Sequence, residues 1–301
     1  MRALVTGAAG VMGSRLVRLL VERGWAVRGL VMPGDRLRAR VEGLCEIVEG
    51  DLHDPASLDR ACEDVTLVYH LAAVILSPDP TVFARVNRDG TAHVVQAAVL
   101  AGVQHLVYVS SASVVYPRRT RYAQSKLEAE EIVKRAPIAH TIVRPTLVYD
   151  EHGGQEFRLF LDYLRRFPVV PFVGPGLARK RPVFSGDVVD GLARMAGNPR
   201  AHGKTYNLSG GEAIPIGEMA RLMLEHQGIR KPFLHLPVGL CRAVAAGMGA
   251  VLDDPPLNHY TIAGMINDAD LDPAEAIRDL GYAPRGVRAG FAHCFPQRSP
   301  A

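Results

Sequence analysis

Cysteine and tryptophan are scarce in this sequence, and their positions argue against a metal-binding or disulfide-rich class. The single tryptophan is Trp25, and the four cysteines are Cys45, Cys62, Cys241 and Cys294. These cysteines are too far apart for the short ligand spacings of structural zinc sites. No secretory signal precedes them, so we expect reduced thiols in a cytoplasmic protein and no bound metal.

Long runs of one residue type are also missing. The net charge is only +4, and the basic residues are spread along the chain, which argues against nucleic acid as a partner. The most apolar stretch, 236–252, is short and contains Arg242, which favours a buried or interface helix over a membrane span. A content of 48% hydrophobic and 22% charged residues is typical of an ordinary soluble globular protein. A small anionic partner such as a nucleotide would suit a modest local excess of arginine.

The sequence does contain a regular alternation of apolar strands and amphipathic helices. Strands are predicted at 2–6, 25–32, 46–48, 66–71, 105–109 and 140–143, and helices at 11–23, 55–62, 82–100 and 122–135. This alternation predicts an α/β fold of the Rossmann type, a doubly wound parallel sheet with helices on both faces.

The pattern changes after about residue 150, where glycine and proline become frequent. Further helices are expected near 157–167, 188–195, 216–226 and 240–252, and a strand near 205–208. We therefore predict a dinucleotide-binding domain over 1–150. Residues 151–301 are expected to form mostly a smaller C-terminal substrate lobe, with segments that return to the sheet.

A glycine-rich turn links the first predicted strand to the first helix. Its glycines are Gly7, Gly10 and Gly13, with Val11 and Met12 between the last two. Glycines at this spacing allow a tight turn and close approach of the backbone to a pyrophosphate, which the start of the helix attracts. A plain strand–helix turn is the alternative, but the repeated strand–helix units favour a dinucleotide site.

The end of the second predicted strand bears on the choice between NAD and NADP. No carboxylate occurs there before Asp35, whereas an acidic residue is expected where NAD is selected. Arg28, Arg36 and Arg38 are close in sequence and could pair with a 2′-phosphate, or could simply coat the surface. The pattern favours NADP and makes Arg36 a candidate contact.

Asp51 follows the third predicted strand. It is a candidate partner of the adenine amino group. The alternative is that it caps the helix that begins at Pro55.

Tyr122 and Lys126 are the candidate chemical centre. They stand four residues apart, so on a helix they share a face. A nearby ammonium favours the phenolate, and lowering a tyrosine pKa by about three units takes about 4 kcal/mol. A surface pair is the alternative, but Ser110–Ser113 end a predicted strand at the edge where ligands bind in open α/β sheets.

These motifs together resemble the extended short-chain dehydrogenase/reductase superfamily, in its epimerase/dehydratase group. The matching pieces are the glycine turn, Gly50–Leu52, Tyr69–Ala73, Asn87 with Gly90–Thr91, Tyr108–Ala112, Tyr122 with Lys126, and Arg144–Tyr149. Two later segments, 181–190 and 280–284, are also similar to that group.

The resemblance implies that Ser111 orients the substrate oxygen, Tyr122 is the acid/base, and Lys126 lowers the tyrosine pKa and grips the ribose. It implies hydride transfer between NAD or NADP and a secondary alcohol or ketone, and a homodimer. With the residues above, the implied or candidate coenzyme contacts are Gly7, Gly10, Val11, Met12, Gly13, Arg36, Asp51, Leu52, Leu71, Ala72, Ala73, Asn87, Val109, Tyr122, Lys126 and Pro145.

The chain also departs from the sugar-modifying members of that group. Only ten residues separate Ser111 from Tyr122, and this short loop is basic; Thr146 follows Pro145, where many sugar epimerases have Asn. No Asp-Glu pair follows the serines, which disfavours dehydration. These features suit a reductase, while the basic segment 179–181 could suit a sugar diphosphate.

Two alternatives remain open. The first is a nucleotide-sugar epimerase with tightly held NAD. The second is a non-catalytic dinucleotide-binding sensor or scaffold. His70 is predicted to be a packed core residue and not a catalytic one.

Overall fold

The computed structural model describes residues 1–151, 154–252 and 255–295. The chain forms two compact units, each assembled from three segments. Unit 1 comprises 1–145, 185–208 and 272–283, and unit 2 comprises 146–184, 209–271 and 284–301. Unit 1 thus contains the predicted 1–150 domain almost whole, together with two later segments.

Unit 1 is built on a parallel sheet of seven strands in the order β11-β6-β5-β4-β1-β2-β3. The strands are β1 (Arg2–Thr6), β2 (Ala26–Val31), β3 (Glu46–Glu49), β4 (Leu67–His70), β5 (His105–Val109), β6 (Ala139–Pro145) and β11 (Lys204–Leu208). The strand order reverses direction between β1 and β4, and such a reversal opens a crevice at the carboxyl ends of the strands. The predicted Rossmann-type α/β fold is confirmed.

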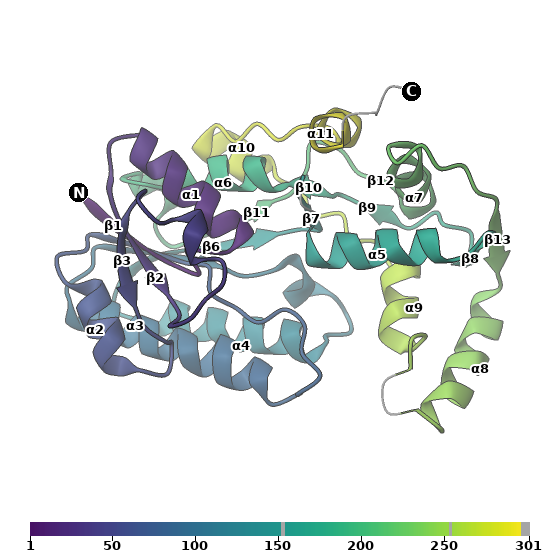
Figure 1. Ribbon diagram of the computed structural model, residues 1–301, viewed down its shortest axis with the longest axis horizontal. Coiled ribbons are helices and arrows are strands. Elements are labelled where there is room, and N and C mark those ends of the chain that lie inside the picture. Colours follow the sequence, from purple (N-terminus) through teal and green to yellow (C-terminus); the bar gives the residue numbers. More distant parts are fainter. Residues whose placement is uncertain (152–153, 253–254, 296–301) are drawn as a thin grey trace. The chain divides into compact units, whose positions relative to one another are not determined.

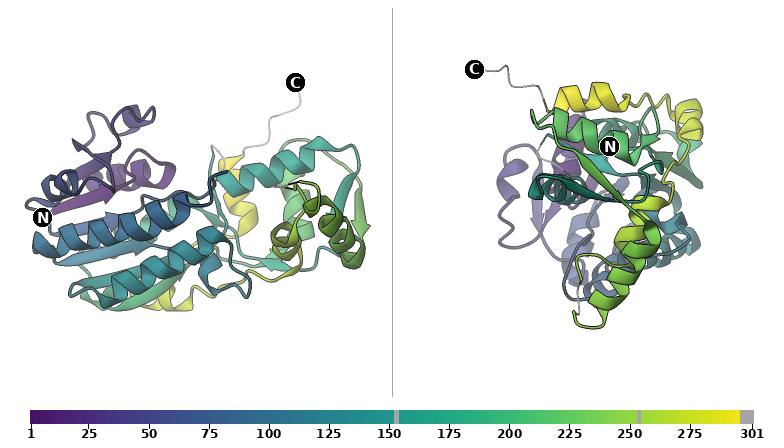
Figure 2. Two further views of the ribbon diagram at one scale, coloured as in Figure 1. Left: turned by 90° about the horizontal axis from the view of Figure 1, so that it is seen from below. Right: turned by 90° about the vertical axis from the view of Figure 1, so that its right-hand side faces the viewer.

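Helices cover both faces of this sheet, because central strands such as β5 are buried along their whole length. Helices α1 (Val11–Glu22) and α6 (Ser185–Ala193) pack against each other on one face (Figure 1). The other face carries α2 (Pro55–Cys62), α3 (Gly90–Leu100) and α4 (Arg121–Arg135). Helices α3 and α4 lie side by side there (Figure 2, left).

The predicted helix 82–100 is one continuous helical segment with two geometries. Its first part, η2 (Phe83–Asp89), is a π-helix that passes directly into α3. The wider π turn changes the direction in which side chains leave the helix, and it is found often at functional sites. It contains Asn87, whose side chain bonds to the backbone of Val74.

The remaining elements of unit 1 are short. They are η1 (Arg38–Arg40), η3 (Ala112–Val115), η4 (Pro199–Ala201) and α10 (Ala274–Leu280). Helix α10 packs against β11, so the latest segment of unit 1 supports its edge strand.

Unit 2 has an aromatic core in place of a large sheet. Tyr149, Phe157, Phe172 and Phe291 are fully buried in it. Its helices are α5 (Gln155–Arg166), α7 (Ile216–Glu225), α8 (Val238–Gly249), α9 (His259–Ile266) and α11 (Val287–Cys294). Its strands, which pair two by two, are β7 (Val148–Tyr149), β8 (Val170–Val173), β9 (Arg179–Lys180), β10 (Val183–Phe184), β12 (Ile214–Pro215) and β13 (Phe233–Leu236).

The predicted helices at 157–167, 216–226 and 240–252 correspond to α5, α7 and α8, with the usual small differences at their ends. Helices α9, α10 and α11 were not predicted. Within the described ranges, the structure contains no helix with the length and hydropathy that a membrane crossing requires.

Candidate functional site

The glycine turn between β1 and α1 is shaped for close approach of a ligand. Gly7 has a φ of +67°, and a Cβ atom there would lie 2.9 Å from the backbone nitrogen of Ala72. A Cβ at Gly13 would lie 2.1 Å from the Gly7 carbonyl oxygen. Gly10 is the N-cap of α1 and has no side chain to cap it, so the first N–H groups of the helix point to where a pyrophosphate binds.

A buried hydrogen-bond chain joins this turn to the end of β4. His70 is fully buried, with Nδ1 2.7 Å from the Thr6 hydroxyl and Nε2 3.0 Å from that of Thr91. Thr6 Oγ1 also accepts a bond from the Ala72 N–H at 3.2 Å. Burial lowers the pKa of His70 to about 3, so this ring is neutral at ordinary pH. The prediction that His70 is a core residue is confirmed.

The three candidate catalytic residues all belong to unit 1, on β5 and the elements that follow it. Ser111 is the second residue after β5 and is the N-cap of η3, where its Oγ accepts from the Ser113 N–H at 3.2 Å. Tyr122 lies in the first turn of α4 and Lys126 one turn later. Because η3 packs against α4, the fold brings the serine segment to the helix that carries the tyrosine and the lysine.

Lys126 is deeply buried for a lysine, with 1% of its surface exposed. Its Nζ lies 4.2 Å from the ring centre of Tyr108 on β5, a cation–π contact that partly replaces water. Burial lowers the pKa of Lys126 to about 7, and Glu130 acts in the opposite direction. Burial also raises the pKa of Tyr108 well above its usual value, with Tyr122 as a second cause.

Asn87 connects the segment after β4 to the start of α4. Its Oδ1 accepts from the Val74 N–H at 2.8 Å, and its Nδ2 donates to the Val74 carbonyl at 2.9 Å and to Ser125 Oγ at 3.1 Å. Ser125 in turn donates to the Tyr122 carbonyl at 2.8 Å. Asn87 therefore fixes the backbone of the helical turn that bears the tyrosine.

The other coenzyme candidates lie at or beyond the carboxyl ends of the strands. Leu71, Ala72 and Ala73 follow β4, Val109 ends β5 and Pro145 ends β6. Asp51 and Leu52 follow β3, where Asp51 Oδ1 accepts from the His53 N–H at 2.8 Å. The N-cap of α2 is Asp54 and not Asp51, so the alternative that Asp51 caps this helix is wrong.

Of the three arginines near the end of β2, Arg28 is not available to contact a 2′-phosphate. Arg28 is 5% exposed, and its Nη1 donates to the carbonyls of Arg60, Ala61 and Glu63 at 2.8–3.1 Å. It holds the end of α2 and is not free to bind a ligand. Arg38 forms ion pairs with Glu42 and Glu49, while Arg36 is exposed.

The side chains of the basic segment 179–181 all have partners within unit 2. Arg181 pairs with Asp270 at 2.6 Å, and Arg179 lies 3.7 Å from the same carboxylate. Lys180 is buried and donates to the Asn267 carbonyl at 2.6 Å. These contacts make the three side chains less available to the diphosphate that the sequence suggested.

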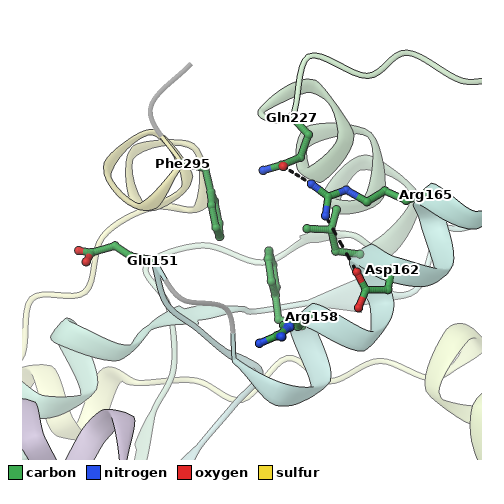
Figure 3. Close-up of a pocket in the computed structure, with 8 residues that line it drawn as sticks. Glu151, Arg158, Asp162, Arg165, Gln227 and Phe295 are labelled. Carbon is green, nitrogen blue, oxygen red and sulfur yellow. Dashed lines mark hydrogen bonds and ion pairs between the residues drawn. The ribbon is translucent and has the colours of Figure 1, made fainter. Parts of the chain in front are cut away.

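Unit 2 also has a hollow of about 230 Å³ between α5, α7 and the end of α11. In Figure 3, Arg165 points toward Gln227 and Asp162, and Phe295 lies at the opposite wall. None of its lining residues was predicted to be a site residue. Its polar side chains bond mostly to one another, so we assign it no role.

A buried charge network beneath Lys126 was missed by the sequence reasoning. Glu130 is fully buried; it accepts from Ser110 Oγ at 2.6 Å and from Arg144 at 2.9 and 2.6 Å. The available signal was its position, one helical turn after Lys126. Its partners are 20 and 14 residues away in the sequence, so only the fold shows the network.

Comparisons with known proteins agree with this geometry. Residues 3–209 match the model of the NAD dependent epimerase/dehydratase family. The chain is 28% identical to a 3 beta-hydroxysteroid dehydrogenase/Delta 5-->4-isomerase of Mycobacterium tuberculosis, over 98% of this chain and 90% of that protein. It is 30% identical to sterol demethylase protein B of Methylococcus capsulatus, over 97% of this chain and 96% of that protein.

Two further similarities are informative. A UDP-glucose 4-epimerase of Mycolicibacterium smegmatis is 29% identical, over 95% of this chain and 94% of that protein. The crystal structure of gox2253 superposes with a TM-score of 0.81 at 28% identity and covers 96% of this chain and 95% of that one.

Proposed function

The chain belongs to the NAD-dependent epimerase/dehydratase family, and from this premise we propose that Tyr122, Lys126 and Ser111 are its catalytic residues. It is an enzyme, an NAD-dependent oxidoreductase of the extended short-chain dehydrogenase/reductase type. The observation that carries the proposal is the buried Lys126 ammonium, held against β5 one helical turn from Tyr122.

The residues of unit 1 fit a dinucleotide. The cradle at Gly7 and Gly13 has no room for a Cβ atom, and the uncapped start of α1 supplies N–H donors for the pyrophosphate. Lys126 would hold the ribose hydroxyls, and Val109 and Pro145 would line the nicotinamide end. When bound, the nicotinamide supplies or accepts the hydride.

The side chains of this chain carry out the proton transfer. Tyr122 donates a proton to the carbonyl oxygen in reduction and removes it from the alcohol in oxidation. Lys126, while charged, stabilises the phenolate. Ser111 Oγ accepts from the Ser113 N–H and lies 2.9 Å from Ser113 Oγ. When Ser113 is the donor in that hydroxyl pair, the Ser111 hydrogen can be donated to the substrate oxygen and fix that oxygen beside Tyr122.

We propose an apolar secondary alcohol or ketone as the substrate. The basic side chains of 179–181 already have partners within unit 2 and are less available to a diphosphate, and two of the similar proteins are named for hydroxysteroid and sterol chemistry. The second candidate is a sugar-nucleotide epimerase, which the similarity to UDP-glucose 4-epimerase favours.

For the coenzyme, we propose that NADP is preferred and that Arg36 is its discriminating contact. The strand β2 ends without a carboxylate, and Asp35 Oδ1 is bonded to the Leu37 N–H at 2.8 Å. Arg36 is exposed beside this turn, whereas Arg28 is buried in a structural role. We also propose that the protein is a cytoplasmic homodimer that pairs through α4.

The test is Tyr122→Phe, assayed by nicotinamide absorbance with a 3β-hydroxysteroid and its ketone and with UDP-glucose. We expect kcat to fall about 10³-fold or more, with NADPH affinity within about threefold of the original protein. Tyr260→Phe, which changes an exposed tyrosine in unit 2, is the matched control and should be silent.

Each alternative predicts a different result. Turnover that survives Tyr122→Phe contradicts the catalytic assignment. Dinucleotide that remains bound through dialysis, with epimerisation of UDP-glucose and no net NADPH consumption, supports the epimerase. Coenzyme binding without turnover of any substrate in a broad panel supports the sensor or scaffold.

A further inference from the structure

The carboxylate of Glu130 is fully buried. It accepts a hydrogen bond from Ser110, the residue that leads into Ser111. It lies on α4, four residues after Lys126. Its oxygens are engaged from two strands, by Ser110 at the end of β5 and by Arg144 at the end of β6. One side chain therefore ties two strand ends to the catalytic helix.

We propose that Glu130 is a positioning residue of this site: it fixes the strand segment that leads into Ser111, and its negative charge favours the charged form of Lys126. The expected effect on kcat rests on the proposed function. The expected effect on the Lys126 pKa does not, because that pKa can be measured in the protein without substrate.

The first half of the proposal follows from connectivity. Ser110 Oγ donates to Glu130 at 2.6 Å, and the Ser110 N–H donates to the Val143 carbonyl at 2.7 Å. The next residue is Ser111. Because Ser110 is held at both its backbone and its side chain, the direction in which the chain enters Ser111 is fixed relative to α4.

The second half follows from charge. Around Lys126 the titratable groups are Tyr122 and Glu130 on its own helix, His70 on β4 and Tyr108 on β5. Burial lowers the pKa of His70 and raises that of Tyr108, so both rings are uncharged at ordinary pH. Glu130 is the only carboxylate in this group, and it opposes the effect of burial on the Lys126 pKa.

Arg144 and Lys134 place positive charge around the Glu130 carboxylate. The Arg144 guanidinium binds both carboxylate oxygens, and Lys134 Nζ lies 3.8 Å away. A bidentate pair of this kind is directional as well as strong. The carboxylate cannot turn toward Lys126 to form a direct ion pair without breaking these bonds, so it acts on the ammonium at a distance.

The decisive experiment is a ¹³C NMR titration of the lysine side chains in the full chain without coenzyme. The sequence has only five lysines, and Lys126→Arg assigns the signal of Lys126. In Glu130→Gln we expect the Lys126 pKa to fall by about one unit from its already lowered value, because the carboxylate that opposes the effect of burial is gone.

The matched control is Glu131→Gln. Glu131 neighbours Glu130 on α4 but pairs with Lys134 at 2.8 Å and is partly exposed. Glu131→Gln should therefore leave the Lys126 pKa unchanged. A Lys126 pKa that does not move in Glu130→Gln, or that moves equally in Glu131→Gln, overturns the proposed effect of Glu130 on Lys126.

If Glu130→Gln does not fold, Glu130→Asp is titrated instead. We then expect the Lys126 pKa to fall by less than one unit, because the negative charge remains but lies farther away.

The positioning part is tested by Ser110→Ala. This variant keeps the charges of Glu130 and Arg144 and removes only the link to the strand end. We expect kcat to fall about tenfold with the KM for coenzyme unchanged. A kcat within twofold of the original overturns the positioning role of Glu130.

Tyr122→Phe in the same assay tests the proposed function separately. Activity that survives in Tyr122→Phe refutes the catalytic assignment, whereas the Lys126 titration still decides the effect of Glu130 on Lys126.

Discussion

At the scale of single residues, the site depends on groups that have been removed from water. Lys126 and Glu130 are buried charges, and His70 is buried and neutral. An isolated buried charge is costly, so each needs nearby charges, dipoles or aromatic faces. Glu130 has a guanidinium and a hydroxyl, and His70 has two threonine hydroxyls. Lys126 has only an aromatic face and a distant carboxylate, so the effect of burial prevails and the pKa of Lys126 is lowered.

Glycine at position 7 is required both by backbone conformation and by space. We predict that Gly7→Ala destabilises unit 1 by about 2 kcal/mol or more, because the left-handed conformation costs about 1–2 kcal/mol and the new methyl group would also collide with the Ala72 backbone. Coenzyme affinity should fall more than tenfold, since the collision moves the turn that faces the pyrophosphate. Urea denaturation and fluorescence titration with NADPH measure the two effects.

Gly24 provides the matched control for that prediction. It also has a positive φ, of +81°, but a Cβ there would meet nothing within 4 Å. Gly24→Ala should therefore show only the conformational cost and normal coenzyme affinity. Equal losses of affinity in the two variants would mean that the space at Gly7 is not what coenzyme binding requires.

At the scale of elements, Arg28 shows how a charged side chain can complete a helix. Its guanidinium occupies the carbonyl end of α2 and pairs with Glu46 at 2.9 Å. We predict that Arg28→Met lowers the free energy of unfolding by about 2–4 kcal/mol, because three carbonyls and one carboxylate lose their partner. Thermal and urea unfolding measure this loss, and the ratio of the KM values for NADPH and NADH should not change.

Arg36→Met should give the reverse pattern. The exposed Arg36 contributes little to folding, within about 0.5 kcal/mol, but its loss should raise the KM for NADPH about tenfold while the KM for NADH stays constant. If Arg28→Met changes the coenzyme preference, or Arg36→Met does not, the assignment of these two arginines is wrong.

Much of unit 1 could be predicted from the sequence because its signals are local. Helix α2 was predicted residue for residue from Pro55 at its first position, and β5 from an apolar run with a clear end. The π geometry of η2 could not be predicted, because it goes with the tertiary bonds of Asn87. Helix α9 was missed because its only buried residue is Ile262, which leaves no apolar periodicity to detect.

The same distinction applies to the site. Gly7, Tyr122 and Lys126 belong to motifs with short spacings, so the sequence alone is enough to make them candidates. The burial of Arg28 could not be predicted from the sequence, because three of its partners are backbone carbonyls, which any sequence would supply. Likewise, Glu130 meets Ser110 and Arg144 only once three separate elements have packed.

At the scale of the whole molecule, the two units are interwoven along the chain. The three segments of each unit alternate, so the chain passes from one unit to the other five times. The later segments supply essential parts of unit 1. Strand β11 pairs with β6, α6 packs on α1, and the buried Tyr69 hydroxyl donates to the Leu192 carbonyl at 2.9 Å.

We therefore predict that a fragment of residues 1–150 does not fold cooperatively, although it contains every predicted site residue. It lacks β11 and α6, so β6 becomes an exposed edge, the inner face of α1 is uncovered, and Tyr69 loses its acceptor. A protein that joins 1–145, 185–208 and 272–283 through glycine-serine linkers restores these contacts and should melt with a sharp transition and bind NADPH. Circular dichroism melting curves and NADPH titration compare the two. A sharp transition in the 1–150 fragment would mean that the later segments are accessory, and that six strands with the first four helices are sufficient for a stable dinucleotide-binding unit.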